Sequence, residues 1–364
     1  MIENYQMMAS AMSSNKNYCC DTSGKPQRVL ALRDSETESL SLSASGGAFM
    51  ILARPIIEAG GVVFGCAWNE NGRAVHVGVE DEEGLRRLQG SKYVQSDTRG
   101  VFSKVAVVLK SGRPVLFSGT PCQVSALYKY LDVAARSLDF DNLVTCDLIC
   151  HGVTSPSLFA AYLKWLANKN GADDGLKDYK FRTKKFGWGL YYYYYYYRAG
   201  KRHEKSGISA DDPYYSAFLS GNYYRESCYV CPFACVSRSS DFTIGDYWGI
   251  EKAHPSFAHN DGASVLLINS KKGVAFFDER CSKRCAWLDS DIELAIAENK
   301  NLIKPTKGRD GFVPIRRKVN ALLYSGDIKG LFEDTLKPSN GVKRLIRKII
   351  PLSVILKVRR VLRG

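Results

Sequence analysis

Pro114-Val-Leu-Phe-Ser-Gly-Thr-Pro-Cys122 is the stretch that best indicates the fold of this chain. Its continuous apolar run, Val115 to Phe117, predicts a buried strand, and a helical pattern follows over residues 123–131. Leu143-Val-Thr-Cys-Asp-Leu-Ile149 is a second strand of the same kind, and it runs into Cys150-His-Gly152. Each of these two strands is therefore followed directly by a cysteine.

Strand and helix patterns alternate on both sides of this stretch. The pattern predicts an α/β fold, with α+β character in the second half: a mixed sheet flanked by helices, with an inserted cysteine-rich segment. Seven consecutive tyrosines, Tyr191 to Tyr197, predict a β-strand with aromatic faces. Further strands are expected at residues 29–32, 61–64, 75–79, 179–182, 241–244 and 264–268. Further helices are expected from residue 48 and at 81–90, 102–109, 155–167, 213–219, 273–281, 291–299 and 314–324.

Length and composition narrow the class of protein. The chain has 364 residues, of which 45% are hydrophobic and 24% charged, so it is neither disordered, coiled-coil nor collagen-like. It has no apolar run of the roughly 20 residues that a membrane span needs. Glu3 and the lack of a continuous apolar stretch near it argue against a signal peptide, so a cytoplasmic location is expected. We expect a loose arm over residues 1–27, a main domain over 28–315 and a helical basic tail over 316–364.

The net charge of +14 lies largely at one end of the sequence. Residues 341–364 contain eight basic side chains and no acidic one, which leaves +6 for the first 340 residues. This distribution argues against nucleic acid as a partner of the main domain. In the tail, aliphatic residues recur at helical spacing among lysines and arginines. The tail is therefore expected to contact an anionic surface, peripherally at the inner membrane, or to dock as a helix on the protein body.

Eleven cysteines are many for a chain expected in a reducing compartment, where thiols serve as ligands, nucleophiles or small core residues. The sharpest short motif is Cys228-Tyr-Val-Cys231-Pro232. A zinc site, a redox dithiol and an iron–sulfur site all use this spacing. The redox dithiol fits least well, because that class expects the pair at the start of a helix that follows a strand, whereas Pro232 and Phe233 follow here.

Cys122 and Cys150 stand just beyond the carboxyl ends of two strands, where open α/β sheets bind their ligands. Together with Cys228 and Cys231 they make four thiolates, the usual number for a cubane cluster. A four-thiolate zinc site and four unrelated core cysteines are the alternatives. Cys235 could replace one ligand. Cys66, Cys146 and Cys285 are expected in the core, and the adjacent pair Cys19-Cys20 is expected to have no ligand role.

Several longer motifs occur in a fixed order around these cysteines. They are Ser45-Gly-Gly-Ala-Phe49, Gly90-Ser-Lys-Tyr-Val-Gln-Ser96, Leu116-Phe-Ser-Gly-Thr-Pro-Cys-Gln123, Asp147-Leu-Ile-Cys-His-Gly152, Arg225-Glu-Ser-Cys-Tyr-Val-Cys-Pro-Phe233 and Arg238-Ser-Ser-Asp-Phe-Thr-Ile-Gly-Asp-Tyr-Trp-Gly249. With them the chain resembles the coenzyme F420 hydrogenase/dehydrogenase beta subunit family, over roughly residues 28 to 315. That family includes formate dehydrogenase beta subunits and a chlorophyll-cycle reductase.

The resemblance implies an iron–sulfur flavoprotein oxidoreductase. A 4Fe–4S cluster would be held by Cys122, Cys150, Cys228 and Cys231, with FAD beside it. Many members carry an N-terminal ferredoxin-like domain, and here only about 25 residues stand in that place. The chain therefore resembles a shortened bacterial member, which would take electrons from a separate donor such as a ferredoxin or a reduced coenzyme. Its substrate, whether it uses coenzyme F420, and a link to polysaccharide and cell-envelope metabolism stay open. The alternative is a non-catalytic, metal-stapled interaction protein of an envelope-assembly complex.

Candidate FAD contacts are glycines, hydroxyls and cations within these motifs. A glycine pair at a helix start presents free N–H groups to phosphate, and a lysine beside a tyrosine offers a cation and a ring. A histidine next to a cluster cysteine can tune the cluster. Asp246 is expected to bind a ribose or to pair with Arg238. The candidate cofactor-binding residues are Ser45, Gly46, Gly47, Ser91, Lys92, Tyr93, Gly119, Thr120 and His151.

Overall fold

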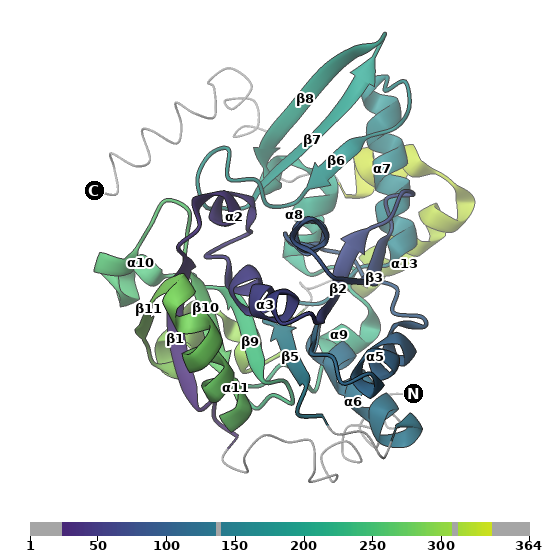
Figure 1. The fold of residues 1–364 in the computed structure, drawn as a ribbon. Helices are drawn as coiled ribbons and strands as arrows, with labels where there is room; N and C mark the ends of the chain where they lie inside the picture. The colour runs from purple at the N-terminus through teal and green to yellow at the C-terminus, as the bar shows by residue number, and fades with distance from the viewer. Residues whose placement is uncertain (1–23, 136–139, 308–311, 337–364) are drawn as a thin grey trace.

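The computed structural model describes residues 24–135, 140–307 and 312–336 (Figure 1). These residues form an eight-stranded sheet with the order β11-β1-β10-β9-β5-β4-β2-β3 and a three-stranded sheet with the order β6-β7-β8. The strands are β1 (Arg28–Asp34), β2 (Val62–Trp68), β3 (Ala74–Val79), β4 (Val115–Gly119), β5 (Leu143–Leu148), β6 (Lys177–Lys180), β7 (Tyr191–Arg198), β8 (Lys201–Ile208), β9 (Phe242–Asp246), β10 (Ser264–Ile268) and β11 (Cys285–Asp289).

Helices cover both faces of the large sheet and support the small one. They are α2 (Thr37–Leu42), α3 (Ala48–Glu58), α4 (Glu82–Leu88), α5 (Val101–Lys110), α6 (Pro121–Ala134), α7 (Pro156–Asn170), α8 (Pro213–Ser220), α9 (Glu226–Tyr229), α10 (Ile250–Ala253), α11 (Lys271–Phe276), α12 (Ile292–Glu298) and α13 (Phe312–Ser325). The expected α/β fold with a mixed sheet and flanking helices is confirmed.

The middle of the large sheet is parallel. β2, β4, β5 and β9 run in one direction, while β3, β10, β1 and β11 pair antiparallel with their neighbours. The carboxyl ends of β4, β5 and β9 therefore lie together at one edge of the sheet. Ligands of open α/β sheets bind at such an edge.

Side-chain alternation along the strands gives the large sheet two apolar faces. On one face, Leu116 and Val144 pack with helix α3, which lies across the sheet in Figure 1. On the other face, Val115, Phe117 and Leu143 pack with α5 and α6. A residue and its neighbour in the same strand thus face opposite layers, as the pleat requires. Both β4 and β5 are buried on two sides, in agreement with their continuous apolar sequences.

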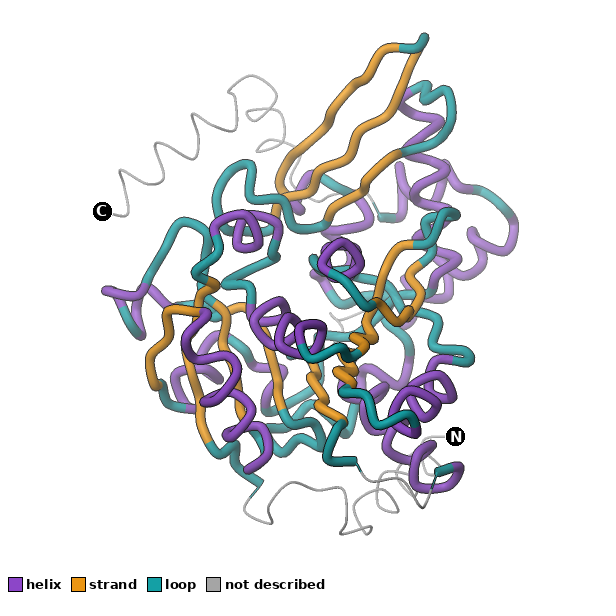
Figure 2. The backbone as a smooth tube through the Cα atoms, in the orientation of Figure 1, coloured by secondary structure: helices purple, strands orange, loops and turns teal. Residues whose placement is uncertain are grey.

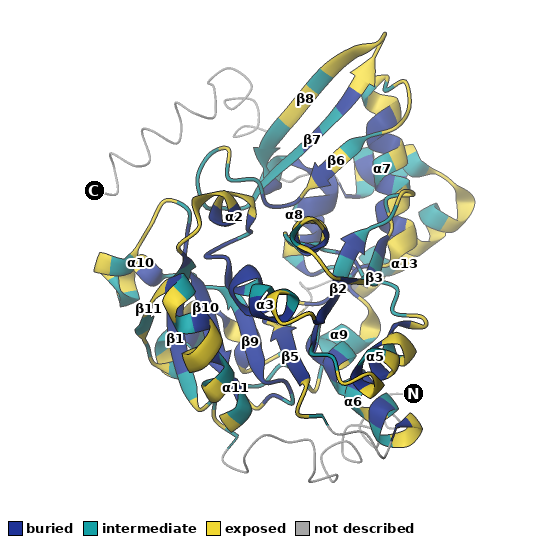
Figure 3. Ribbon diagram, in the orientation of Figure 1, coloured by how far each residue is buried: buried dark blue, intermediate teal, exposed yellow. Residues whose placement is uncertain are grey.

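Strands β7 and β8 of the three-stranded sheet form a long hairpin that projects from the rest of the protein (Figure 2). β7 contains the seven tyrosines and pairs with β8 from Tyr191 opposite Ile208 to Arg198 opposite Lys201. Tyr194 and Tyr196 are buried in a second core with α7, α8 and α13. The end of the hairpin is exposed (Figure 3). The expected strand with aromatic faces is present.

Residues beyond 315 share this second core. Helix α13 runs through the expected boundary at 315/316, and Val319, Leu331 and Phe332 are buried against the tyrosine cluster. The division into a main domain over residues 28–315 and a tail over residues 316–364 stays a prediction. Most of the loose arm and of the basic tail, residues 1–23 and 337–364, lies outside the described residues. In the described part of the chain, no helix has both the length and the apolarity to cross a membrane.

Candidate functional site

The four candidate ligand cysteines are held at the carboxyl edge of the parallel strands. Cys122 lies in the first turn of α6, directly after β4, and its Sγ is 3.1 Å from the Thr120 hydroxyl. Cys150 follows β5 after Ile149. Cys228 lies in the short helix α9, and Cys231 follows it in the next turn. The two halves of the set are about 80 residues apart in sequence.

Backbone contacts bring the two halves together. The N–H of Arg225 donates to the carbonyl of Val153 at 2.9 Å, which ties the start of the cysteine loop to the segment after Cys150. The Tyr229 hydroxyl donates to the Gly221 carbonyl at 2.7 Å and accepts from the Tyr224 N–H at 3.0 Å. These two bonds tie Tyr229, the neighbour of Cys228 in α9, to the segment that precedes the helix.

The four thiols are electrostatic neighbours. Burial raises the pKa of Cys150, and negative charge at Cys122, Cys228 and Cys231 raises it further. The pKa of Cys228 is raised by burial and by Cys122, and that of Cys231 by burial and by Cys122 and Cys228. Four ionised thiols so placed destabilise one another unless a cationic group lies between them.

The thiols do not crowd around one point. Among the described residues, no group of three or more His, Cys, Asp or Glu side chains converges closely enough to hold a single metal ion. The Sγ of Cys235 lies 3.1 Å from the Ser237 carbonyl oxygen. Cys146 and Cys285 lie in the core as expected. Cys66, also expected in the core, is partly exposed and lines a cavity.

That cavity, of about 290 Å³, lies beside the cysteines at the carboxyl ends of β4, β5 and β9. Cys122 forms part of its wall. The segments that line it are the turn before α3, the loop of residues 89–96 and the ends of the three strands. Eight of the nine candidate FAD contacts are in its wall: Ser45, Gly47, Ser91, Lys92, Tyr93, Gly119, Thr120 and His151.

Gly46 is the exception, because it lies where two backbone segments approach each other closely. A Cβ there would lie 2.3 Å from the Leu32 carbonyl oxygen and 2.4 Å from the Ser264 nitrogen, so only glycine fits between β1 and β10. Gly47 caps α3 in the left-handed conformation, with φ of 85°. Ala48 and Phe49, in the first turn of α3, line the cavity, and the first amides of a helix have no partner within the helix.

Some candidate contacts already have partners within the protein. The Ser45 hydroxyl donates to the Ala263 carbonyl at 2.6 Å. The Lys92 ammonium donates to the carbonyls of Leu88 and Gln89 at 3.0 and 2.8 Å, and also reaches those of Arg87 and Gly90, so it caps the end of α4. Burial lowers the pKa of Lys92 to about 8. A phosphate contact at Lys92 stays a prediction.

Asp246 has a different partner from the one expected. Arg182, from the loop after β6, binds it through two hydrogen bonds of 2.6 and 2.8 Å, and the Trp188 indole donates to it at 2.8 Å. Arg238 lies instead 3.7 Å from Asp147, and both side chains are almost fully buried. The expected Arg238–Asp246 pair is therefore wrong. Arg238 is eight residues from Asp246 in sequence and 91 from Asp147, so proximity in sequence favoured the wrong partner.

Residues that the sequence did not single out complete the wall. Trp248 lines the cavity and stacks on Trp188 at 4.6 Å between ring centroids. His76 and Gln89 also line it. His76 alternates with Val75 and Val77 in β3, and its position on the buried face of that strand was the available signal.

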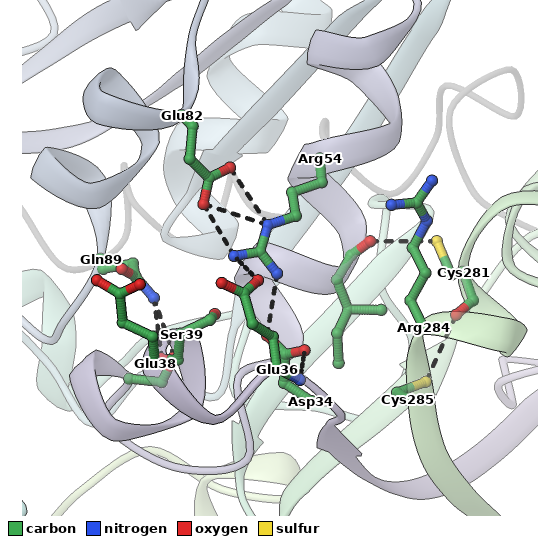
Figure 4. A network of polar contacts seen from close by, with 12 residues as sticks. Asp34, Glu36, Glu38, Ser39, Arg54, Glu82, Gln89, Cys281, Arg284 and Cys285 are labelled. Atoms are coloured by element: carbon green, nitrogen blue, oxygen red, sulfur yellow. Dashed lines mark hydrogen bonds and ion pairs between the residues drawn. The ribbon is translucent and has the colours of Figure 1, made fainter.

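A larger hollow of about 680 Å³ lies on the other side of α3. Its charged side chains bind one another: Arg54 pairs with Glu36 at 2.5 Å and Glu82 at 2.8 Å (Figure 4). Arg284 pairs with Glu58. None of the candidate site residues lines it. The cavity beside the cysteines is therefore the candidate functional site.

The thiols and the cavity of this mixed α/β sheet lie at the carboxyl ends of its parallel strands, where α/β proteins of this class bind their ligands. Residues 112–291 match the sequence model that describes the C-terminal part of the beta subunit of coenzyme F420 hydrogenase/dehydrogenase. The chain belongs to the coenzyme F420 hydrogenase/dehydrogenase beta subunit family, and all four candidate cysteines lie in the matched region. The family places the chain among oxidoreductase-related subunits.

One solved structure that matches is the F420-reducing NiFe hydrogenase complex from Methanosarcina barkeri, in a xenon-derivatised form. The identity is 18%, the TM-score is 0.49, and the match covers 86% of this chain and 91% of that one. No curated protein matches the chain in sequence.

Proposed function

We propose that this chain is an iron–sulfur flavoprotein oxidoreductase. Cys122, Cys150, Cys228 and Cys231 would hold a 4Fe–4S cluster, and the neighbouring cavity would hold FAD. The observation that carries the proposal is the double placement of Cys122, which belongs to the four-thiol set and lines the cavity. The substrate or coenzyme that receives the electrons is unassigned.

The donor set fits a cluster. Four thiolates are the usual ligands of a 4Fe–4S cluster. A single zinc ion would need its sulfur ligands about 4 Å apart, as follows from bonds of about 2.3 Å in a tetrahedron. A four-iron cluster holds its thiolates around a larger body. The two groups differ in composition, so iron, sulfide and zinc analysis separates them.

The cavity wall fits a nucleotide cofactor. The amides at the start of α3 and the guanidinium of Arg225 supply hydrogen-bond donors and positive charge, which suit a diphosphate. The volume of about 290 Å³ is at the lower end for small-molecule sites, so FAD would extend beyond the enclosed part. When bound, a flavin exchanges hydride and single electrons. The chain's own residues would bind it, orient it and keep water from it.

Two further parts of the proposal concern the electron donor and the basic tail, most of which lies outside the described residues. An external donor, such as a ferredoxin or a reduced coenzyme, would supply electrons. The basic tail would bring the protein to an anionic membrane surface. Replacing the eight lysines and arginines of residues 341–364 by glutamine would then abolish co-sedimentation with anionic liposomes. Co-sedimentation unchanged from that of the natural chain would contradict this part.

Composition and absorbance test the central proposal. Protein purified without oxygen is expected to contain four iron, four sulfide and one FAD per chain, and to bleach with dithionite. Cys228→Ala is expected to lose most of the iron. Cys235→Ala removes a thiol in the same loop and is expected to keep it. A colourless protein with one zinc per chain and no flavin would contradict the proposal and favour a metal-stapled interaction protein.

A further inference from the structure

The positive charge of the chain, apart from the basic tail, is concentrated in one stretch. This basic stretch, residues 299–320, contains seven basic side chains and one acidic side chain. Its net charge of +6 equals that of the first 340 residues together, so the other residues before position 341 carry no net charge. A local charge of this size attracts anionic partners.

The first part of the basic stretch, residues 300–307, lies against the loop that follows β5. The Thr306 hydroxyl donates to the carbonyl of His151 at 2.8 Å and accepts from the side-chain amide of Asn301 at 2.9 Å. His151 is the neighbour of Cys150 in sequence. The two bonds therefore hold this part beside one of the four cysteines.

Helix α13 brings the second part of the basic stretch to the cysteine loop. The guanidinium of Arg316 is 2.8 Å from the carboxylate of Glu226, which lies two residues before Cys228. Val313 and Arg317, one helical turn apart on the same side of α13, are both exposed. The basic stretch therefore lies beside both halves of the cysteine set.

The charges of the basic stretch are available to a partner. The three lysines of residues 300–307 are exposed, and the ion pair of Arg316 is the only one that the stretch makes among the described residues. Ile303 is 49% exposed, and Val230, inside the Cys-x-x-Cys motif of the loop, is 56% exposed. Apolar side chains among basic ones are the composition of a surface that binds an acidic protein.

We propose that the basic stretch, with Val230, is the docking surface for an acidic protein that carries one electron at a time. This rests on the proposed function, because it takes the four cysteines as the ligands of a redox-active cluster. Cys122 is exposed, so the cysteine set reaches a surface that a carrier protein can approach. At each encounter the carrier would lose one electron to the cluster, and two encounters would supply the electron pair that a flavin stores.

Charge and position together select this class of partner. Opposite charges on two proteins raise the rate of encounter and orient the pair, which would bring the redox centre of the carrier towards the cysteine loop. A hydride-donating coenzyme would bind at the flavin and needs no such surface. Nucleic acid and anionic membranes share the negative charge, but neither carries a redox centre. The position of the basic stretch beside the cysteines therefore favours a carrier protein.

Binding and electron transfer test this surface in the full chain, prepared without oxygen and containing its iron and flavin. The probe is a small acidic ferredoxin, used oxidised to measure affinity and reduced to measure the rate at which it reduces the chain. Lys304→Glu combined with Lys307→Glu is expected to weaken binding and to slow reduction about tenfold or more at low salt. The difference should nearly vanish at about 0.5 M salt, because salt screens exposed charges. Arg317→Glu should act in the same direction, by about threefold.

Lys201→Glu combined with Lys205→Glu is the matched control. It makes the same change of charge in β8, on the hairpin that projects from the rest of the protein (Figure 1). Affinity and rate should stay within about twofold of those of the natural chain, because the hairpin charges act only at long range. Iron and flavin contents should be equal in the natural chain and all variants, which separates docking from cofactor binding.

Three results would overturn the docking surface and leave the proposed function standing. One is a natural chain, containing its iron and flavin, that neither binds the ferredoxin nor takes electrons from it. Another is an equal loss in the two lysine-pair variants, or no loss in either. The third is a Lys304 and Lys307 variant that keeps its affinity for ferredoxin and loses binding to single-stranded DNA or to anionic vesicles. A chain that contains neither iron nor flavin would overturn the proposed function as well.

Discussion

The backbone of Gly152 packs closely against the ring of Tyr224. Its φ is 131°, and a Cβ at this position would be 2.4 Å from Cδ2 of that ring. Gly152 follows the cysteine at the end of β5, and Tyr224 precedes the loop that carries the other pair. This close approach is therefore one of the contacts that bring the two halves of the cysteine set together.

Gly152→Ala is expected to separate the two halves. The added methyl group forces the ring or the backbone to move, and we expect a loss of about 2 kcal/mol or more in stability. Iron content should fall in parallel. Gly112→Ala is the control, since Gly112 also has a positive φ, of 77°, but no atom within 4 Å of the added group. The control should lose about 1 kcal/mol and keep its iron. Full iron content in Gly152→Ala would show that the contact does not position the cysteines.

The buried pair of Arg182 and Asp246 joins the small sheet to the end of β9. Burial alone would raise the pKa of Asp246, but the charge and hydrogen bonds of Arg182 hold it below its ordinary value. Asp246→Asn and Arg182→Met are each expected to lower the free energy of unfolding by about 3 to 5 kcal/mol, because each leaves an uncompensated buried group. The double variant should lose less than the sum, measured by urea denaturation. Additive losses would mean that the pair is not coupled.

Asp212 makes part of the stability depend on pH. Burial raises its pKa to about 6 from the ordinary 3.8. The folded state then holds the proton more tightly than the unfolded state. This tighter proton binding stabilises the folded state in full below pH 3.8. The contribution, about 3 kcal/mol of unfolding free energy, is lost as the pH rises through about 6. Asp212→Asn cannot titrate, so its stability relative to the natural chain should improve between pH 4 and pH 7. A difference that stays constant with pH, in urea midpoints, would contradict this.

The tyrosine strand should respond to substitution with a period of two. Tyr194 is 5% exposed and packed in the second core, whereas Tyr195 is on the opposite face with Arg202 over its ring at 4.3 Å. Tyr194→Ala is expected to cost about 3 kcal/mol or more, and Tyr195→Ala about 1 kcal/mol or less. Thermal unfolding of the two variants compares them directly. Equal losses would indicate that the register of β7 is wrong.

Local patterns predicted the parts of the site that are contiguous in sequence. β4 and β5 are continuous apolar runs, and the cysteines that follow them had to lie at the carboxyl edge once the strands were parallel. β8 and β11 were missed because they lack the expected alternation: Lys201–Ile208 is mostly charged and polar, and it is a strand because β7 supplies its hydrogen bonds. Propensity cannot show such dependence on a partner strand.

Contacts between distant segments decided the rest of the site. Lys92 was expected to bind phosphate, and its ammonium caps α4, because the helix ends where the lysine side chain can turn back on it. Arg182 and Trp188 come from a loop between two strands of the other sheet, so nothing in the Gly-Asp-Tyr-Trp motif around Asp246 could indicate them.

Mössbauer spectroscopy of protein grown on ⁵⁷Fe and purified without oxygen tests the central claim most directly, because it reports how many irons are coupled in one cluster. We expect the quadrupole doublets of one diamagnetic 4Fe–4S cluster per chain, which disappear in the Cys150→Ala variant and persist in Cys235→Ala. A spectrum without cluster iron, from a chain that instead carries zinc at the four thiols, would contradict the account.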